Sequence, residues 1–300
     1  MTAPALPRPG GDGSGDLAAL ADRYGLEPSS HRPPFLSYAA SVWERRHFIV
    51  EFARAQTTKR YSAARLGQLW QVLTPLFNAA VYFVVFGLFL NTRRGVSPQQ
   101  YVAFLTSGVM VFTFFNRSVQ NGASAVRGNL GLIRALHFPR ACMPLSTSIV
   151  EIQQMLVSMV VLIGIVIATG QPITVHWLML LPTLVLATIF ASGLTLIVSR
   201  IGANLPDISQ LLPFFVRFWL YTSGVFYSIE AFAASKPALA DVLYANPAAV
   251  YIELTRAALL TGPQFEVRPN AWLLAIGWAL VSSLGGFLFF WRGEHSYGRG

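Results

Sequence analysis

The chain has 300 residues, of which 54% are hydrophobic and only 12% are charged. Soluble domains carry about 25% charged residues, so the composition argues against a soluble enzyme and favours a membrane protein with several spans. The formal net charge of +9 does not indicate nucleic acid binding, because the basic residues flank apolar runs, where Lys and Arg set orientation and contact anionic lipid.

Two segments precede the first apolar run. Residues 1–33 are rich in Pro, Gly and Ala, which predicts a disordered tail. Residues 34–58 mix aromatic and aliphatic residues with arginines such as Arg45 and Arg46. This segment carries too much charge to span, so it predicts an amphipathic helix lying in the membrane interface. A soluble helix packed on another domain is the alternative interpretation.

Six apolar runs are long enough to cross a hydrocarbon core of about 30 Å. They cover residues 66–90, 101–120, 145–169, 177–198, 208–227 and 271–291. Residues 59–292 are therefore expected to form one transmembrane domain, followed by a short tail at 293–300. Between the last two runs, residues 228–270 predict two short helices that do not span. Lys and Arg are concentrated on the side of both termini, which predicts that both termini are cytoplasmic.

Residues 125–144 form a basic island between the second and third runs. Asn129 is expected to cap a short helix through its side chain. Leu132, Ile133 and Leu136 then fall on one face, and Pro139 ends the helix near His137 or Phe138. The alternative is a simple connector whose arginines only set topology.

Charged residues near membrane depth have two interpretations. Arg117, Glu151 and Arg217 would suit ion coupling in a secondary transporter. For Arg117 and Glu151 the sequence favours snorkelling to the interface from positions near the ends of their spans. Arg217 is expected to lie deeper.

The sequence has no Walker A, HExxH, GxSxG or paired CxxC pattern. We therefore expect no catalytic residue, bound metal or cofactor in this chain, and any uphill transport must draw energy from a gradient or a partner. A membrane-embedded glycosyltransferase is a further alternative, but it would need an acidic pair that is absent outside the predicted spans.

Three of the predicted spans are rich in aromatic side chains. Such rings contact sugar faces without tight binding, although they are also common in lipid-facing belts. The candidates for lining a channel are Tyr82, Phe86, Phe112, Phe115, Phe215, Trp219, Tyr221 and Phe226.

Four stretches, in this order, resemble the permease subunit of type-2 ABC exporters of polysaccharides, the family of O-antigen and teichoic-acid exporters. They are RYSAARLGQLWQVLTPL, NLGLIRALHFPRACMPLS, NLPDISQLL followed by YTSGVFY, and NPAAVYIELTRAALLTG. Within the family, the Arg-, Ala- and Gly-rich character is most similar to the galactan exporter of mycobacterium-type cell walls. The long N-terminal tail and the short C-terminal tail depart from the family pattern.

The resemblance implies an all-α polytopic fold with about six spans, an interfacial helix, a cytoplasmic coupling helix and two short external re-entrant or gate helices. It implies a homodimer in the bacterial inner membrane that exports a polyprenyl-pyrophosphate-linked polysaccharide. ATP and Mg would be bound by a separate ATPase subunit. A drug or lipid permease is the alternative within ABC transporters.

The resemblance also assigns roles to residues. Those expected to couple to the ATPase are Asn129, Leu132, Ile133, Arg134, His137, Phe138 and Arg140. Those expected at a gate for the lipid pyrophosphate are Arg45, Arg46, Lys59, Arg60 and Arg65. Those expected at an outer gate are Tyr244, Asn246, Glu253 and Arg256.

Overall fold

The computed structural model describes residues 34–62, 67, 69–82, 84–85, 98–136, 138–230 and 237–294. Within these residues the fold is all-α and contains no strand, which confirms the predicted fold class. The expected tail at 1–33 lies outside the described residues, as do Arg65, Phe86 and His137.

Four helices among the described residues are long and apolar enough to cross a membrane. They are α5 (Pro98–Ser124), α7 (Cys142–Ala168), α8 (Leu180–Asn204), which follows the 3-10 turn η3 (Val175–Met179), and α13 (Ala271–Arg292). Their bounds follow the apolar runs of the sequence, because a long apolar run satisfies its backbone groups within lipid by forming a helix.

The two other predicted spans contain shorter helices. α4 (Leu69–Tyr82) has 14 residues with Pro75 inside it, and α9 (Ile208–Thr222) has 15 residues with Pro213 inside it. At about 1.5 Å per residue each is roughly 21–23 Å long, which is less than the hydrocarbon core of about 30 Å. The predicted first span continues beyond α4 into residues outside the described ranges.

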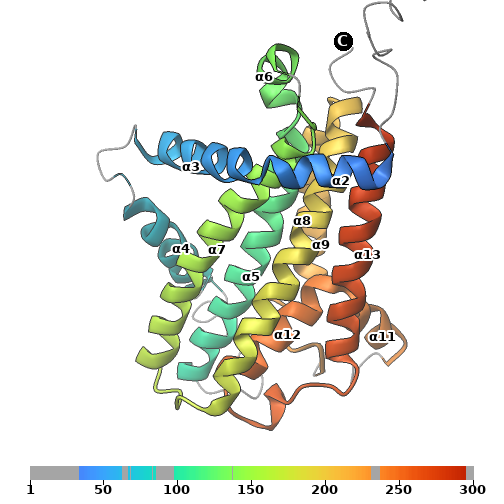
Figure 1. Ribbon diagram of the computed structural model, residues 1–300. Helices are drawn as coiled ribbons and strands as arrows, with labels where there is room; N and C mark the ends of the chain where they lie inside the picture. Colours follow the sequence, from blue (N-terminus) through green and yellow to red (C-terminus); the bar gives the residue numbers. More distant parts are fainter. Residues whose placement is uncertain are drawn as a thin grey trace, which may run out of the picture.

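Two helices lie across one end of the bundle, nearly perpendicular to the spans (Figure 1). They are α2 (Phe35–Glu44) and α3 (Arg46–Ser62), which meet at a turn at Arg45. The short helix α6 (Leu130–Ala135) projects beyond them. We call this the α6 end. The single interfacial helix expected at 34–58 is thus two helices, and its continuation reaches Ser62.

At the opposite end, the α12 end, lie α11 (Pro237–Ala245), α12 (Pro247–Leu259) and the 3-10 turn η4 (Pro263–Phe265). Asn246 caps α12 by accepting a hydrogen bond from the Ala248 backbone N–H at 3.1 Å, and Pro247 occupies the first turn, as both residues favour. The two short helices expected in this region are present. α12 is almost entirely buried, since it packs against α5, α8 and α13.

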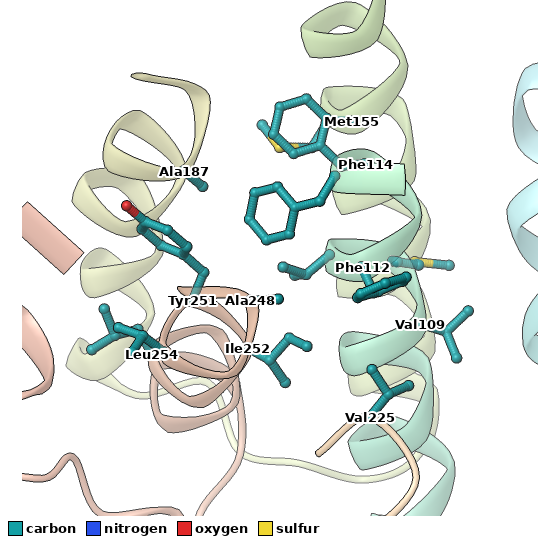
Figure 2. Packing of buried hydrophobic residues seen from close by; sticks show 14 of the residues in the cluster. Val109, Phe112, Phe114, Met155, Ala187, Val225, Ala248, Tyr251, Ile252 and Leu254 are labelled. Atoms are coloured by element: carbon teal, nitrogen blue, oxygen red, sulfur yellow. The ribbon is translucent and has the colours of Figure 1, made fainter. Parts of the chain in front are cut away.

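The main core fills the space between α5, α7, α8 and α12. Figure 2 shows Phe112 and Phe114 of α5 in one cluster with Tyr251 and Ile252 of α12. The buried hydroxyl of Tyr251 donates to the Ala275 carbonyl of α13 at 2.8 Å, which satisfies the one polar atom of a buried ring.

The backbones of α8 and α13 are in close contact where Gly193 and Gly286 face each other. A Cβ placed on Gly286 would lie 2.4 Å from the carbonyl oxygen of Gly193, and one on Gly193 would lie 2.3 Å from the backbone of Ser282. Small residues allow this backbone contact, which is a common basis of helix association in membranes.

Candidate functional site

The α6 segment is entered from a helical turn. The 3-10 turn η2 (Arg127–Asn129) leads into α6, and Asn129 makes no side-chain capping bond. Its Nδ2 instead donates to the Ala125 carbonyl at 2.7 Å. The expected cap is wrong because Asn129 ends the turn η2 with φ −123° and ψ 20°, whereas an N-cap residue typically has an extended backbone.

α6 ends earlier than the sequence predicts. Its last residue is Ala135, and the backbone of Leu136 is extended. Ile133 is buried and Leu132 is half-buried, but Arg134 is exposed and Leu136 is 49% exposed. The predicted apolar face is therefore divided, since Ile133 packs into the protein while Leu136 and Arg134 face outward from the α6 end.

Phe138 attaches the exit of this segment to α3. Its ring lies 5.3 Å from the ring of Phe48, which in turn stacks on Phe52 at 5.6 Å. Aromatic pairs at these distances are favourable beyond their buried area. Phe138 thus faces the protein and packs on α3, so α3 lies against the residues that follow α6.

Arg140 attaches the same exit to the end of α13. Its backbone N–H donates to Glu294 Oε1 at 2.9 Å, and its guanidinium donates to the Glu294 carbonyl. The Tyr38 hydroxyl of α2 donates to Glu294 Oε2 at 2.7 Å and accepts from the Ala141 backbone N–H at 3.1 Å. Arg140, expected to couple to the ATPase, is half-buried and makes these contacts within the chain.

Burial raises the pKa of the Glu294 carboxyl, although the Arg140 N–H, the Tyr38 hydroxyl and the Arg140 guanidinium oppose the rise. Burial also raises the pKa of Tyr38 well above its ordinary value, and the neighbouring Glu294 charge adds to the rise. Sequence reasoning missed Glu294 because it treated residues 293–300 as a short tail. The only signal was one acidic residue just after the last span.

The five basic residues expected at one gate do not gather in one place. Arg46 lies at the start of α3, where its guanidinium is 5.6 Å from the centroid of the Trp43 ring. Lys59 and Arg60 lie about 20 Å farther along α3, by the helical rise. Arg45 occupies the turn between α2 and α3. Lys59 and Arg60 line one cavity together, whereas Arg46 lines a different one, and Arg65 lies outside the described residues.

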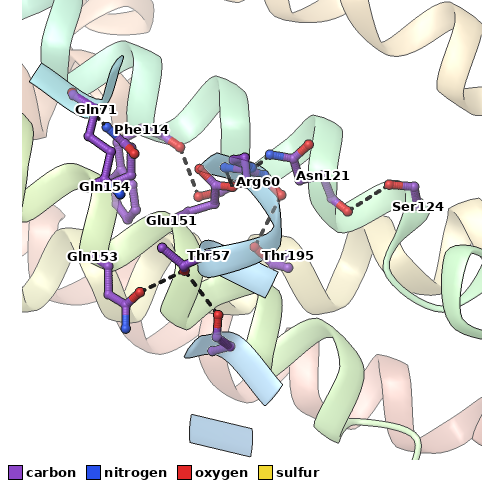
Figure 3. A network of polar contacts seen from close by, with 12 residues as sticks. Thr57, Arg60, Gln71, Phe114, Asn121, Ser124, Glu151, Gln153, Gln154 and Thr195 are labelled. Carbon is purple, nitrogen blue, oxygen red and sulfur yellow. Dashed lines mark hydrogen bonds and ion pairs between the residues drawn. The ribbon is translucent and has the colours of Figure 1, made fainter. Parts of the chain in front are cut away.

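Arg60 forms an ion pair with Glu151 of α7 in a polar network that Figure 3 shows. Both terminal nitrogens of Arg60 lie 3.3 Å from Glu151 Oε1, and Asn121 Nδ2 of α5 donates to the same oxygen at 2.7 Å. Glu151 is 1% exposed, and its Oε2 is buried without a hydrogen bond from any residue that the structure describes. Glu151 therefore does not snorkel to the interface as expected, because Arg60 and Asn121 compensate its charge internally.

A cavity of about 380 Å³ adjoins this network. Its polar lining includes Lys59, Arg60, Asn121, Asn129 and Glu151. The cavity therefore lies between the basic end of α3 and the start of the α6 segment. Its donors are of the kind that hold anionic oxygens.

The aromatic residues expected to line a channel fall into two groups. Phe112, Phe115 and Phe226 are buried and Trp219 is half-buried, with Phe115 in ring contact with Phe190, Trp219 and Tyr251. They pack the core of the single chain instead of lining an open surface. Phe215 and Tyr221 are exposed on α9. Phe86 lies outside the described residues and the Tyr82 side chain is not described.

The residues expected at an outer gate do lie at the α12 end. Asn246 accepts a hydrogen bond from Trp219 Nε1 at 2.8 Å, which joins α9 to α12. Arg256 is buried and donates to the carbonyls of Phe104, Gly224 and Val225. Glu253 pairs with Arg268, whose guanidinium lies over the ring of Tyr244.

Comparison with known protein families decides the class of this chain. Residues 49–260, well over half of the chain, match the family model described as ABC-2 type transporter. The chain belongs to the ABC-2 type transporter family. The match begins within α3 and ends just after α12, so this part of the ABC-2 transporter fold contains the Arg60–Glu151 pair and α6, while Tyr38 and Glu294 lie outside it.

Curated relatives of this ABC-2 transporter include two O-antigen export system permease proteins RfbA. The one from Klebsiella pneumoniae is 25% identical over 57% of this chain and 65% of its own length, and the one from Myxococcus xanthus is 24% identical over 63% and 71%. The polysialic acid transport protein KpsM of Escherichia coli is 24% identical over 68% of this chain and 77% of its own. The chain thus spans slightly less than two thirds of the Klebsiella relative.

Proposed function

We propose that this chain is the permease subunit of an ABC transporter that exports a lipid-linked polysaccharide across the bacterial inner membrane. Membership of the ABC-2 family and the export and transport names of the relatives support this proposal. In it, the α6 end faces the cytoplasm, as the bias of Lys and Arg predicts, and ATP is hydrolysed by a separate subunit that binds ATP and Mg.

The single observation that carries the coupling role is the position of α6. It projects beyond the bundle with Arg134 and Leu136 exposed, while Phe138 and Arg140 tie its exit to α3 and α13. A helix that is exposed on one side and anchored on the other transmits the movement of a partner to the spans. In this proposal the partner is the ATPase subunit.

The cavity beside Lys59 and Arg60 is the proposed entry site for the lipid pyrophosphate, because it offers two cationic side chains at the end of a surface helix.

The exposed face of α9, with Leu211, Phe214, Phe215, Phe218 and Tyr221, is the proposed contact between two copies of the chain. Large apolar side chains exposed on one face favour a protein contact or a lipid contact. A homodimer would place these rings along a shared path for the glycan.

The proposed substrate is a cell-wall galactan carried on polyprenyl pyrophosphate, for which the support is the overall resemblance of the sequence to galactan exporter permeases. Export of a drug or a simple lipid is the competing function. Depletion separates them, because loss of a galactan exporter leaves the lipid-linked polymer on the cytoplasmic side, whereas loss of a drug exporter changes only tolerance to small molecules.

Copurification tests the requirement for a partner. The full-length chain is expressed together with an ABC ATPase encoded beside it and purified through a tag on the permease alone. We expect a stable complex whose ATPase activity depends on the permease. If no ATPase copurifies and energised vesicles transport substrate without one, the proposal is wrong.

A further inference from the structure

A second polar cavity, of about 350 Å³, lies at the α12 end of the molecule. Buried side chains from α5 and α12 form its inner part, together with the residue that closes η4. They are Phe104, Ala249, Arg256 and Phe265. The cavity thus has an aromatic and apolar floor and lies at the opposite end from the basic cavity beside Lys59 and Arg60.

Arg256 shapes this floor. Its guanidinium carbon lies 3.4 Å from the centroid of the Phe104 ring, and its nitrogens donate to the carbonyls of Phe104, Gly224 and Val225 at 2.9–3.2 Å. The guanidinium is therefore committed to backbone groups. It holds the loop after α9 against α5 and is not positioned as a clamp for a phosphate.

One wall of the cavity is a rigid cluster of three side chains. Arg268 Nε lies 2.9 Å from both carboxylate oxygens of Glu253, and the Arg268 backbone N–H donates to Glu253 Oε1 at 3.2 Å. The same guanidinium stacks 3.9 Å from the centroid of the Tyr244 ring. Mutual contacts fix these groups before any ligand arrives, and such preorganisation lowers the entropic cost of binding.

The rim adds polar side chains: the carboxylates accept hydrogen bonds, and the amide and the hydroxyl both donate and accept. Gln264, Glu266 and Glu230 are exposed, and Ser228 is half-buried beside them. Within the lining, carboxylates outnumber guanidinium groups, with Glu230, Glu253 and Glu266 against Arg256 and Arg268. This balance disfavours a multiply charged anion. It suits a neutral ligand that carries many hydroxyl groups.

We propose that this cavity binds carbohydrate, taking the end or a short stretch of the glycan as it leaves the membrane. The small exposed parts of Phe104 and Phe265 offer apolar contact to a sugar ring. The carboxylates accept hydrogen bonds from sugar hydroxyls, and the guanidinium and amide groups donate to them. The volume is at the lower end of the range for small-molecule sites, so the occupant is a few sugar units of the polymer. This inference rests on the proposed function and adds a subsite to it.

The test uses the purified full-length chain in lipid nanodiscs and a linear galactotetraose as the probe. Saturation-transfer NMR measures binding, with inorganic pyrophosphate as the anionic competitor. Gln264→Ala and Glu266→Gln change exposed rim residues and should leave the fold intact. Asp241→Asn, an exposed carboxylate of α11 outside the cavity lining, is the matched control.

We expect the galactotetraose to bind the wild type and the Asp241→Asn control equally. The Gln264→Ala/Glu266→Gln double variant should bind at least about fivefold more weakly, because hydrogen bonds to charged and amide groups are lost. Pyrophosphate should not compete. Absence of binding, equal binding by the double variant, or displacement by pyrophosphate would each overturn the carbohydrate site. These results leave the proposed function standing if depletion still strands the lipid-linked glycan on the cytoplasmic side.

Discussion

Arg60 of α3 and Glu151 of α7 form an ion pair that joins the helix lying across the α6 end to a spanning helix, with 3.3 Å between each terminal guanidinium nitrogen and Glu151 Oε1. Asn121 of α5 donates to the same oxygen. The network thus fixes three elements around a cavity that Asn129 of the α6 segment also lines. A movement of α6 would therefore act on the side chains of Arg60, Asn121 and Glu151. A charged ligand bound beside Arg60 would act on the same three side chains.

Replacing Glu151 should destabilise the protein. Glu151→Ala leaves the Asn121 amide without its acceptor and Arg60 without its partner, which we expect to cost about 1–3 kcal/mol. Thermal unfolding in detergent measures the loss. Glu51→Ala is the matched control, because the Glu51–Arg54 pair is exposed on the same helix α3, and such pairs contribute about 0–1 kcal/mol. Equal unfolding temperatures for the two variants would contradict the structural role of the buried carboxylate.

The glycine contact between α8 and α13 gives a second matched pair of variants. Gly286→Ala places a Cβ 2.4 Å from the Gly193 carbonyl oxygen, whereas nothing lies within 4 Å of a Cβ on Gly285. We expect Gly286→Ala to destabilise by about 1–3 kcal/mol through overpacking. Gly285→Ala should be neutral or slightly stabilising, since alanine has the higher helix propensity. If Gly286→Ala lowers the unfolding temperature less than Gly285→Ala does, α8 and α13 are not in contact at Gly286.

The buried Glu294 carboxyl predicts a dependence of stability on pH. Its pKa is raised by burial, so the folded protein retains this proton to a higher pH than the unfolded chain does. The resulting stabilisation is complete below the ordinary glutamate pKa of about 4.3 and is lost as the pH rises through the raised value. Glu294→Gln should therefore flatten the fall in unfolding temperature above about pH 4.3. If the unfolding temperature of Glu294→Gln falls with pH as steeply as that of the wild type, the pH dependence comes from other groups.

Arg134 should matter for coupling and not for folding. Its side chain is exposed on α6, so Arg134→Ala should unfold within about 0.5 kcal/mol of the wild type. In the complex with the ATPase, export should fall at least about fivefold if Arg134 is an interface hot spot. Combining it with Phe138→Ala, which removes the ring contact with Phe48, should uncouple ATP hydrolysis from export. Arg54→Ala on α3 is the control, and full transport by the double variant would refute the coupling role.

Four of the six predicted spans are helices long enough to cross a membrane in the part of the chain that the structure describes, because long apolar runs permit few other structures in lipid. The sequence could not predict the contacts that close the α6 end, since Arg140 and Glu294 are 154 residues apart and no pattern in the sequence pairs them. The channel role of Phe112 and Phe115 is predicted from the density of aromatic side chains in their span, which does not show whether the rings pack on protein or line a path. The buried Glu151 shows the same limit, because its depth depends on a partner supplied by α3.

Depletion of the protein in its own cells tests the central claim most directly. Lipid-linked glycans on the two faces of the inner membrane are measured after the permease is depleted. The proposed function predicts that one polyprenyl-linked polymer, identified as galactan by its sugar composition, accumulates on the cytoplasmic face and declines outside. An unchanged distribution of every lipid-linked glycan would contradict a role in polysaccharide export.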